Sequence, residues 1–283
     1  MSGPYQHGNL EGIASAMDER YKNGETYRYE LPWDISRHEE LHKAVAELVV
    51  GHVEDMLAGM RKGRWISLLD VGCGMRPALM RPYLLPALKK AGADYVYALL
   101  TDISQEAINV VSKHAMENES KFMTMAASAT PVENLKKSMT QGSVDVVVSV
   151  ESIEHWSDVE AGLASIHHVL SEDGVFVLTT PNRDSLHVRM GRLLGVDVPF
   201  CSSDHTYEFG YEELDEIMDK AGFVKVGERG VGFAPYWALE GILGNTIRQF
   251  TDRDPEVVSL LNQVGKSCPE FSFCQAKAFK RKV

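Results

Sequence analysis

The chain has 283 residues, 44% of them hydrophobic and 24% charged, a composition typical of a globular protein rather than a disordered chain. Its 40 acidic and 29 basic residues give a net charge of −11, which argues against a nucleic-acid partner but leaves room for a local basic patch. No run approaches the ~18 apolar residues that span a bilayer, residues 1–10 lack an apolar signal core, and the four cysteines show neither metal nor disulfide spacing, so we expect a cytoplasmic protein.

The first 34 residues are predicted to form an arm in front of one domain, residues 35–283. Glycines and prolines are scattered through this arm, which favours irregular structure. The aromatic residues between Tyr21 and Trp33 indicate a segment that either folds over a site or packs on the surface of the domain.

The domain is predicted to open with a long helix. The pattern Ser36-x-x-Glu39 is a capping box, and apolar residues recur after it at helical spacing as far as about Met60. Arg37 and His38 lie in the first turn of this helix, and we interpret both as solvated charges.

Residues 67–74 read as a buried strand that runs into a tight turn. Gly72 and Gly74 allow a positive φ there and let a ligand approach the main chain, although a strand–turn–helix without a ligand shows the same pattern. The next strand, residues 95–102, ends in Asp102, which lies 28 residues after Gly74. An α/β nucleotide-binding fold places its ribose-hydroxyl acceptor at such a position.

The remaining elements alternate between helices and strands. Pro82 and Pro86 predict short helical pieces, and Ser104 is predicted to cap the following helix. A second capping box, Ser157-x-x-Glu160, predicts another helix. Further strands are expected at residues 121–126, 144–150, 175–180 and 223–228, helices at 211–221 and within 236–264, and an antiparallel strand at 271–279. The fold class is therefore α/β, a Rossmann-like seven-stranded, mostly parallel sheet with helices on both faces and an antiparallel last strand.

The chain carries Asp70-Val71-Gly72-Cys73-Gly74, then the acid Asp102, then Val144-Asp145-Val146-Val147-Val148-Ser149 with Glu151-Ser152-Ile153-Glu154-His155, and finally Thr179-Thr180-Pro181-Asn182-Arg183. Together, over roughly residues 65–228, these motifs resemble class I S-adenosylmethionine-dependent methyltransferases. An NAD-dependent dehydrogenase has the same strand logic, but these motifs fit methyl transfer better. The resemblance implies S-adenosylmethionine as cofactor, with Asp102 on the ribose hydroxyls and residues 128–129 at the adenine edge. The implied cofactor-binding positions are Asp70, Gly72, Cys73, Gly74, Asp102, Ile103, Ser128, Ala129 and Val150.

A second set of residues is predicted to bind or activate the molecule that accepts the methyl group. Glu151, Glu154, His155 and His205 combine carboxylates and imidazoles, a set that suits Mg²⁺ or Mn²⁺. The Glu-x-x-Glu-His block is similar to that of ubiquinone-biosynthesis O-methyltransferases. Small-RNA 3′-terminal 2′-O-methyltransferases carry this block together with a segment similar to residues 204–209. In both, the resemblance implies a divalent ion that grips the acceptor oxygens.

A metal-free alternative remains open for the same residues. In it His155 acts as the catalytic base or orients the acceptor, and Glu154 holds the loop. The first functional hypothesis is O-methylation of a small molecule held under the arm and an insertion at residues 181–210. The alternatives are 2′-O-methylation of an RNA 3′ end and a non-catalytic, cofactor-binding partner subunit. No oligomeric state is predicted.

Overall fold

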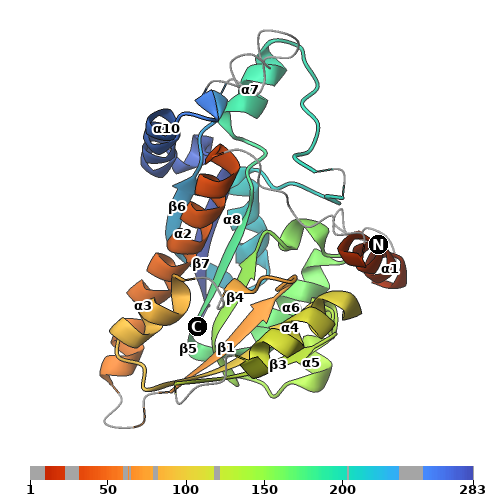
Figure 1. The fold of residues 1–283 in the computed structure, drawn as a ribbon, viewed down its shortest axis with the longest axis vertical. Coiled ribbons are helices and arrows are strands. Elements are labelled where there is room, and N and C mark those ends of the chain that lie inside the picture. The colour runs from red at the N-terminus through yellow and green to blue at the C-terminus, as the bar shows by residue number, and fades with distance from the viewer. Residues whose placement is uncertain are drawn as a thin grey trace.

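The computed structural model describes residues 10–22, 32–59, 63, 65–78, 82–117, 122–202, 204–235 and 251–282, of which residues 114–117 are described by their backbone. Within these ranges the chain forms one seven-stranded sheet of order β3-β2-β1-β4-β5-β7-β6 (Figure 1). β7 runs antiparallel to both of its neighbours, and the pairs among β1 to β5 are parallel, which confirms the predicted fold class. The strands are β1 Trp65–Val71, β2 Tyr95–Thr101, β3 Met123–Ser128, β4 Val144–Val150, β5 Leu170–Pro181, β6 Phe223–Val231 and β7 Cys274–Arg281.

Helices cover both faces of the sheet, because alternate residues of the central strands are apolar on both sides. Val146 and Val148 of β4 pack toward the face that carries α2 and α3, whereas Val147 packs toward α6 and α8. A strand buried on both faces reads as a continuous β-branched run, which is why β4 was recognisable. The described helices are α1 Leu10–Lys22, α2 Pro32–Ala58, α3 Leu84–Lys90, α4 Gln105–Glu117, α5 Leu135–Ser138, α6 Val159–Val169, α7 Leu186–Leu193, α8 Tyr211–Lys220 and α10 Pro255–Ser267.

The capping box predicted at Ser36 is wrong. α2 begins at Pro32, whose fixed φ suits the first helical position, and the predicted boundary between arm and domain therefore falls inside this helix. Trp33 is 1% exposed and packs edge-on against Phe273, so burial of this ring fixes the helix start. The Ser36 hydroxyl instead accepts a hydrogen bond from Asn262 Nδ2 at 2.8 Å.

The second capping box is wrong by one residue. Asp158 caps α6 by accepting a hydrogen bond from the Ala161 N–H at 2.9 Å. The Ser157 hydroxyl donates to the buried Glu133 carboxylate at 2.7 Å. Both serines were thus drawn away from the helix end by a partner that is distant in sequence.

Other local predictions are confirmed. The Ala107 N–H donates to Ser104 Oγ at 3.1 Å, so Ser104 caps α4 as expected. α3 is a short piece with Pro86 in its first turn, where a missing N–H costs nothing. The segment after β5 contains α7, a helix that the sequence did not predict. Of the predicted helical stretch 236–264, residues 236–250 lie outside the described residues, and most of the aromatic arm does too.

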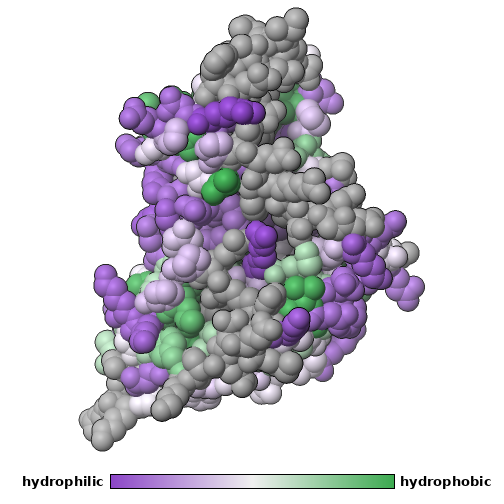
Figure 2. All heavy atoms as spheres, viewed as in Figure 1, coloured by the Kyte–Doolittle hydropathy of each residue, from purple (hydrophilic) through white to green (hydrophobic). Residues whose placement is uncertain are grey.

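No described helix combines the length and apolarity needed to cross a bilayer. On the face shown in Figure 2, apolar side chains form small groups between polar ones.

Candidate active site

A cavity that is partly open to solvent lies at the carboxyl ends of β1, β2 and β4. Ligands of open α/β sheets bind at this edge, because the loops there converge from several strands. The first turns of α2 and the inner side of α1 also line the cavity. Of the predicted cofactor positions, the lining includes Asp70, Gly72, Cys73, Gly74, Asp102, Ile103 and Val150.

The glycine turn after β1 requires its glycines. Gly72 has φ +66° and Gly74 has φ +55°, a backbone region that residues with a Cβ rarely adopt. An ideal Cβ on Gly72 would overlap the Ser152 hydroxyl and come within 2.6 Å of the Ser152 Cβ. Asp70 is 1% exposed, and its Oδ2 accepts a hydrogen bond from the Ala78 N–H at 2.7 Å, which closes the turn from one end to the other.

Asp102 ties this turn to the next helix. Its carboxylate accepts hydrogen bonds from the Gly74 N–H and from the Ser104 N–H, both at 2.9 Å. The side chain is buried, and burial raises its pKa. It lies in the cavity at the end of β2, the position at which the ribose acceptor was predicted.

The predicted adenine contacts at Ser128 and Ala129 do not line the cavity. The Ser128 hydroxyl shares a hydrogen bond with Thr130 Oγ1 at 2.8 Å, and the Thr130 N–H bonds back to the Ser128 carbonyl at 2.9 Å. This tight turn carries the following residues over the cavity, so that residues 130–133 form its wall.

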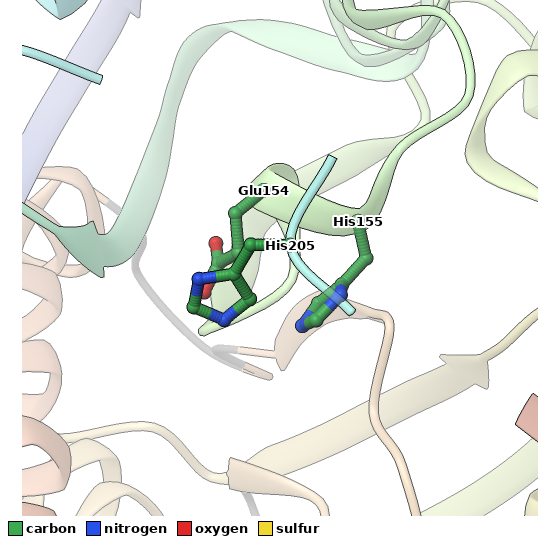
Figure 3. A group of neighbouring side chains, drawn as sticks. All are labelled: Glu154, His155 and His205. Carbon is green, nitrogen blue, oxygen red and sulfur yellow. The ribbon is translucent and has the colours of Figure 1, made fainter. Parts of the chain in front are cut away.

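Glu154, His155 and His205 form a cluster beside the cavity. One ligand atom from each lies within 4.8 Å of the others. Glu154 and His155 occupy consecutive positions of the 3₁₀ turn after β4, and His205 reaches them from the segment before α8 (Figure 3). Two segments that are 50 residues apart in sequence therefore meet at this point, and His155 itself lines the cavity.

Neighbouring residues hold each member of the cluster in place. Glu154 is 0% exposed, its Oε2 accepts a hydrogen bond from Thr180 Oγ1 at 2.9 Å, and its Oε1 has no hydrogen-bond partner among the described residues. His205 Nδ1 bonds to Glu208 Oε1 at 2.7 Å, and His155 Nδ1 bonds to a main-chain carbonyl at 3.1 Å. These bonds leave Nε2 of each ring as the nitrogen that can bind a ligand.

Comparison with known proteins identifies the family. Residues 36–228 match the sequence model of a family described as a methyltransferase domain, which covers more than half of the chain. The chain belongs to the methyltransferase family. It is 27% identical over 203 residues to a ubiquinone biosynthesis O-methyltransferase from Cereibacter sphaeroides, covering 69% of this chain and 76% of that protein. It is 33% identical over 122 residues to the protein of the same name from Haemophilus ducreyi, covering 41% and 46%.

Solved structures of methyltransferases share the fold. Magnesium protoporphyrin IX methyltransferase from Synechocystis PCC 6803, with bound S-adenosylhomocysteine, aligns with a TM-score of 0.54 at 13% identity, over 96% of this chain and 98% of that one. The 1,6-didemethyltoxoflavin-N1-methyltransferase from Burkholderia thailandensis aligns with a TM-score of 0.53 at 13% identity, over 100% and 94%. The protein is an S-adenosylmethionine-dependent methyltransferase, and its cavity lies where such folds bind the cofactor.

Burial sets the electrostatics of the cluster in this methyltransferase. It raises the pKa of Glu154 to about 8, with a further contribution from the charge of Glu151. It lowers the pKa of His155 to about 3, helped by His205 and Arg20, so this imidazole is neutral at neutral pH. Burial also lowers the pKa of His205, but the Glu208 hydrogen bond and nearby carboxylates outweigh it, and the net shift is upward.

Glu151 does not join the cluster, contrary to its prediction as a metal ligand. Its Oε2 accepts a hydrogen bond from Arg37 Nη1 at 3.2 Å, and its Oε1 accepts one from Thr179 Oγ1 at 3.3 Å. The backbone of Glu151 has φ +50°, in the left-handed region that residues other than glycine rarely adopt. The methyltransferase thus offers one carboxylate and two imidazoles at this point.

Arg37 is predicted to be a solvated charge, and this is wrong, because its side chain is 13% exposed and pairs with Glu151. Both Arg37 and His38 line the cavity. The Arg37 guanidinium lies 5.5 Å from the ring centroids of Trp33 and Phe273, a position reached only because α2 starts at Pro32. His38 shares a hydrogen bond with His42 one turn later at 3.2 Å.

The sequence reasoning also missed helix α1, which supplies four lining residues. A signal for it existed, because three of these residues recur at intervals of four, as on one face of a helix. The missed lining residues of α1 are Ile13, Met17, Arg20 and Tyr21.

Proposed function

We propose that this methyltransferase methylates an oxygen atom of a small-molecule acceptor, and that a divalent cation held by Glu154, His155 and His205 grips that acceptor. The observation that carries the proposal is the fully buried Glu154 carboxylate, whose Oε1 has no hydrogen-bond partner among the described residues and lies beside two imidazoles. Burial raises the pKa of this carboxyl to about 8, so it keeps its proton at neutral pH unless a bound cation compensates the charge of its ionised form. The relatives named O-methyltransferases support an oxygen acceptor.

The donor set of two imidazole nitrogens and one carboxylate oxygen suits a borderline divalent cation such as Mn²⁺ better than Mg²⁺, whose preferred ligands are oxygens. One carboxylate oxygen and two imidazole nitrogens leave coordination positions open for acceptor oxygens. Thr180 and Glu208 hold Glu154 and His205 by hydrogen bonds, as the partners of metal ligands commonly do. A bound cation supplies charge stabilisation and lowers the pKa of a coordinated hydroxyl.

The reaction is a direct displacement. The acceptor oxygen attacks the sulfonium methyl carbon, an O–C bond forms while the S–C bond breaks, and the electron pair of that bond stays on sulfur as S-adenosylhomocysteine leaves. The residues of the cavity align the two reactants, and such alignment contributes up to about 7–11 kcal/mol in well-oriented systems. With the cation bound, the acceptor hydroxyl loses its proton to solvent. In the metal-free alternative, Nε2 of His155, which is neutral at neutral pH and lines the cavity, would accept that proton instead.

A titration of chelator-treated protein tests the proposal. Calorimetric titration with Mn²⁺, in the presence of S-adenosylhomocysteine, should show one tightly bound ion. Methylation of a catechol, whose two hydroxyls can chelate the ion, should require Mn²⁺. A phenol with a single hydroxyl is the control acceptor. Glu154→Gln should lose ion binding and turnover, whereas Glu172→Gln, which removes an exposed carboxylate, should keep both. Full turnover after chelation would contradict metal assistance and leave His155 as the base.

Methylation of an RNA 3′ end is the second candidate. The observation that favours it is that His205, from the segment 204–209, lies beside Glu154 and His155. The resemblance to small-RNA methyltransferases implies this arrangement. The net charge of −11 opposes it. An oligoribonucleotide with a free 3′ end and its 3′-terminal 2′-O-methyl derivative distinguish the two, since only the first would accept a methyl group. Cofactor binding without turnover on any acceptor would instead support a partner subunit.

A further inference from the structure

We propose that Arg20 of α1 and Asp204 form a clasp that orients His155 when α1 lies over the cofactor. Arg20 and Asp204 are then positioning residues, which act on the reaction through His155. The inference rests on the proposed function, because His155 belongs to the proposed acceptor site. It goes beyond that function by linking the closure of the cofactor cavity to the geometry of the acceptor side.

Helix α1 lies over the cavity without being part of the core. Its residues Ile13, Met17 and Tyr21 line the cavity, and the Tyr21 hydroxyl lies 3.2 Å from the position of an ideal Cβ on Gly74. None of the residues of α1 is buried. Since no side chain of this helix is fully buried, its polar contacts with the domain contribute to how firmly it is held there.

One of these contacts is at the ribose end of the cavity. Asp18 Oδ1 accepts hydrogen bonds from Ser104 Oγ at 2.5 Å and from the Glu106 N–H at 3.1 Å. These donors stand at the N-terminus of α4, where a carboxylate is favoured by the helix dipole. Ser104 also donates its N–H to Asp102, so this contact is two residues away from the predicted ribose acceptor.

A second contact is at the acceptor end. Arg20 Nη1 donates to Asp204 Oδ2 in an ion pair whose side chains are 22% and 26% exposed. Figure 1 shows the segment that descends from α7 toward the side of the domain on which α1 lies. These two contacts thus join α1 to the N-terminus of α4 and to the segment before α8.

Asp204 passes the effect on to His155. Its main-chain carbonyl accepts the hydrogen bond from His155 Nδ1 at 3.1 Å, and its Oδ2 lies 3.7 Å from the same nitrogen. Arg20 and the Ser202 hydroxyl hold the Asp204 carboxylate, so the ring stays on the carbonyl. If Arg20 withdrew, the carboxylate could compete for Nδ1, and the direction of Nε2 toward the acceptor would change.

This arrangement predicts that cofactor binding and the orientation of His155 are linked. A cofactor under α1 favours the seated helix, and the seated helix places Arg20 on Asp204. Because such coupling is reciprocal, breaking the ion pair between Arg20 and Asp204 should reduce the change in His155 that cofactor binding causes. The linkage needs neither an acceptor nor a metal ion to be seen.

Nuclear magnetic resonance of the ¹⁵N-labelled imidazole of His155 tests this linkage, with the wild-type protein, Arg20→Gln, Arg20→Lys and Lys22→Gln. Lys22→Gln removes an exposed cation from the same helix and serves as the control. Addition of S-adenosylhomocysteine should shift the Nε2 signal in the wild-type protein, in Lys22→Gln and, as conservative rescue, in Arg20→Lys. The shift should be lost in Arg20→Gln. An equal shift in Arg20→Gln would overturn the proposal.

Steady-state kinetics provides the second measurement. Arg20→Gln should lower kcat about five- to tenfold with little change in the KM of the acceptor, and Asp204→Asn combined with it should add no further loss. Additive losses would overturn the clasp. If no acceptor is methylated but the cofactor still shifts the His155 signal in an Arg20-dependent way, the clasp stands and the proposed function fails.

Discussion

Asp70→Asn should make the protein more stable at neutral and alkaline pH. Burial raises the pKa of this carboxyl from 3.8 to about 7, so the folded chain keeps a proton on it that the unfolded chain gives up. The amide introduced by the substitution would carry no charge to bury, and its oxygen can still accept the hydrogen bond from the Ala78 N–H. The glycine turn should therefore keep its shape.

The magnitude follows from the size of the shift. Between pH 5 and pH 7 the unfolded chain holds fewer protons at this site than the folded chain, so the free energy of unfolding contributed by Asp70 falls as pH rises. The full slope of about 1.4 kcal/mol per pH unit applies near pH 5 and is halved at pH 7, where the folded carboxyl is half ionised, so the fall is about 2 kcal/mol. The stability of Asp70→Asn relative to the wild-type protein should rise by that amount over this interval and level off above pH 7.

Urea unfolding at half-unit steps from pH 5 to pH 8.5 measures this difference. Glu172→Gln, at an exposed position, is the control and should give a difference from the wild-type protein that does not depend on pH. Other buried acids titrate in both proteins and cancel in the difference. A difference between Asp70→Asn and the wild-type protein that stays constant, or falls as pH rises, would refute the reasoning.

Three further substitutions test the site. Gly72→Ala should weaken S-adenosylhomocysteine binding about tenfold or more in calorimetry, because its Cβ would overlap Ser152. The control is Gly142→Ala, at φ +65° with open space around it, which should lower only the free energy of unfolding, by about 1–2 kcal/mol. Equal affinities of the two variants for S-adenosylhomocysteine would contradict this. Asp102→Asn loses one of two charge-assisted hydrogen bonds, so thermal melts should show a free energy of unfolding about 1.5–3 kcal/mol lower. Calorimetry should also show weaker binding of S-adenosylhomocysteine. An unchanged affinity would mean that the ribose binds elsewhere. Glu208→Gln should lower Mn²⁺ affinity about 10- to 100-fold, and an unaltered Mn²⁺ titration would argue against the proposed ion site.

Local sequence patterns predicted correctly those features that depend only on residues adjacent in the sequence. The β-branched run of β4, the Ser104 cap and the glycines of the first turn were all predicted, because backbone conformation and strand burial are encoded over a few residues. The same reasoning failed at Ser36 and Ser157. A capping box satisfies a helix end only if no distant partner binds the serine first, and here Asn262 and Glu133 do.

The sequence by itself determined the seven strands in chain order, the glycine turn and the acid that follows β2, since each depends on local patterns, but it did not reveal helices α1 and α7. It also pointed to Glu154, His155 and His205. Only the tertiary structure decided which side chains meet. Contact between His205 and the turn after β4, the pairing of Glu151 with Arg37 and the seat of α1 above the cavity all join segments far apart in the chain. Their positions depend on how helices and loops pack around one sheet, and no local pattern encodes that packing.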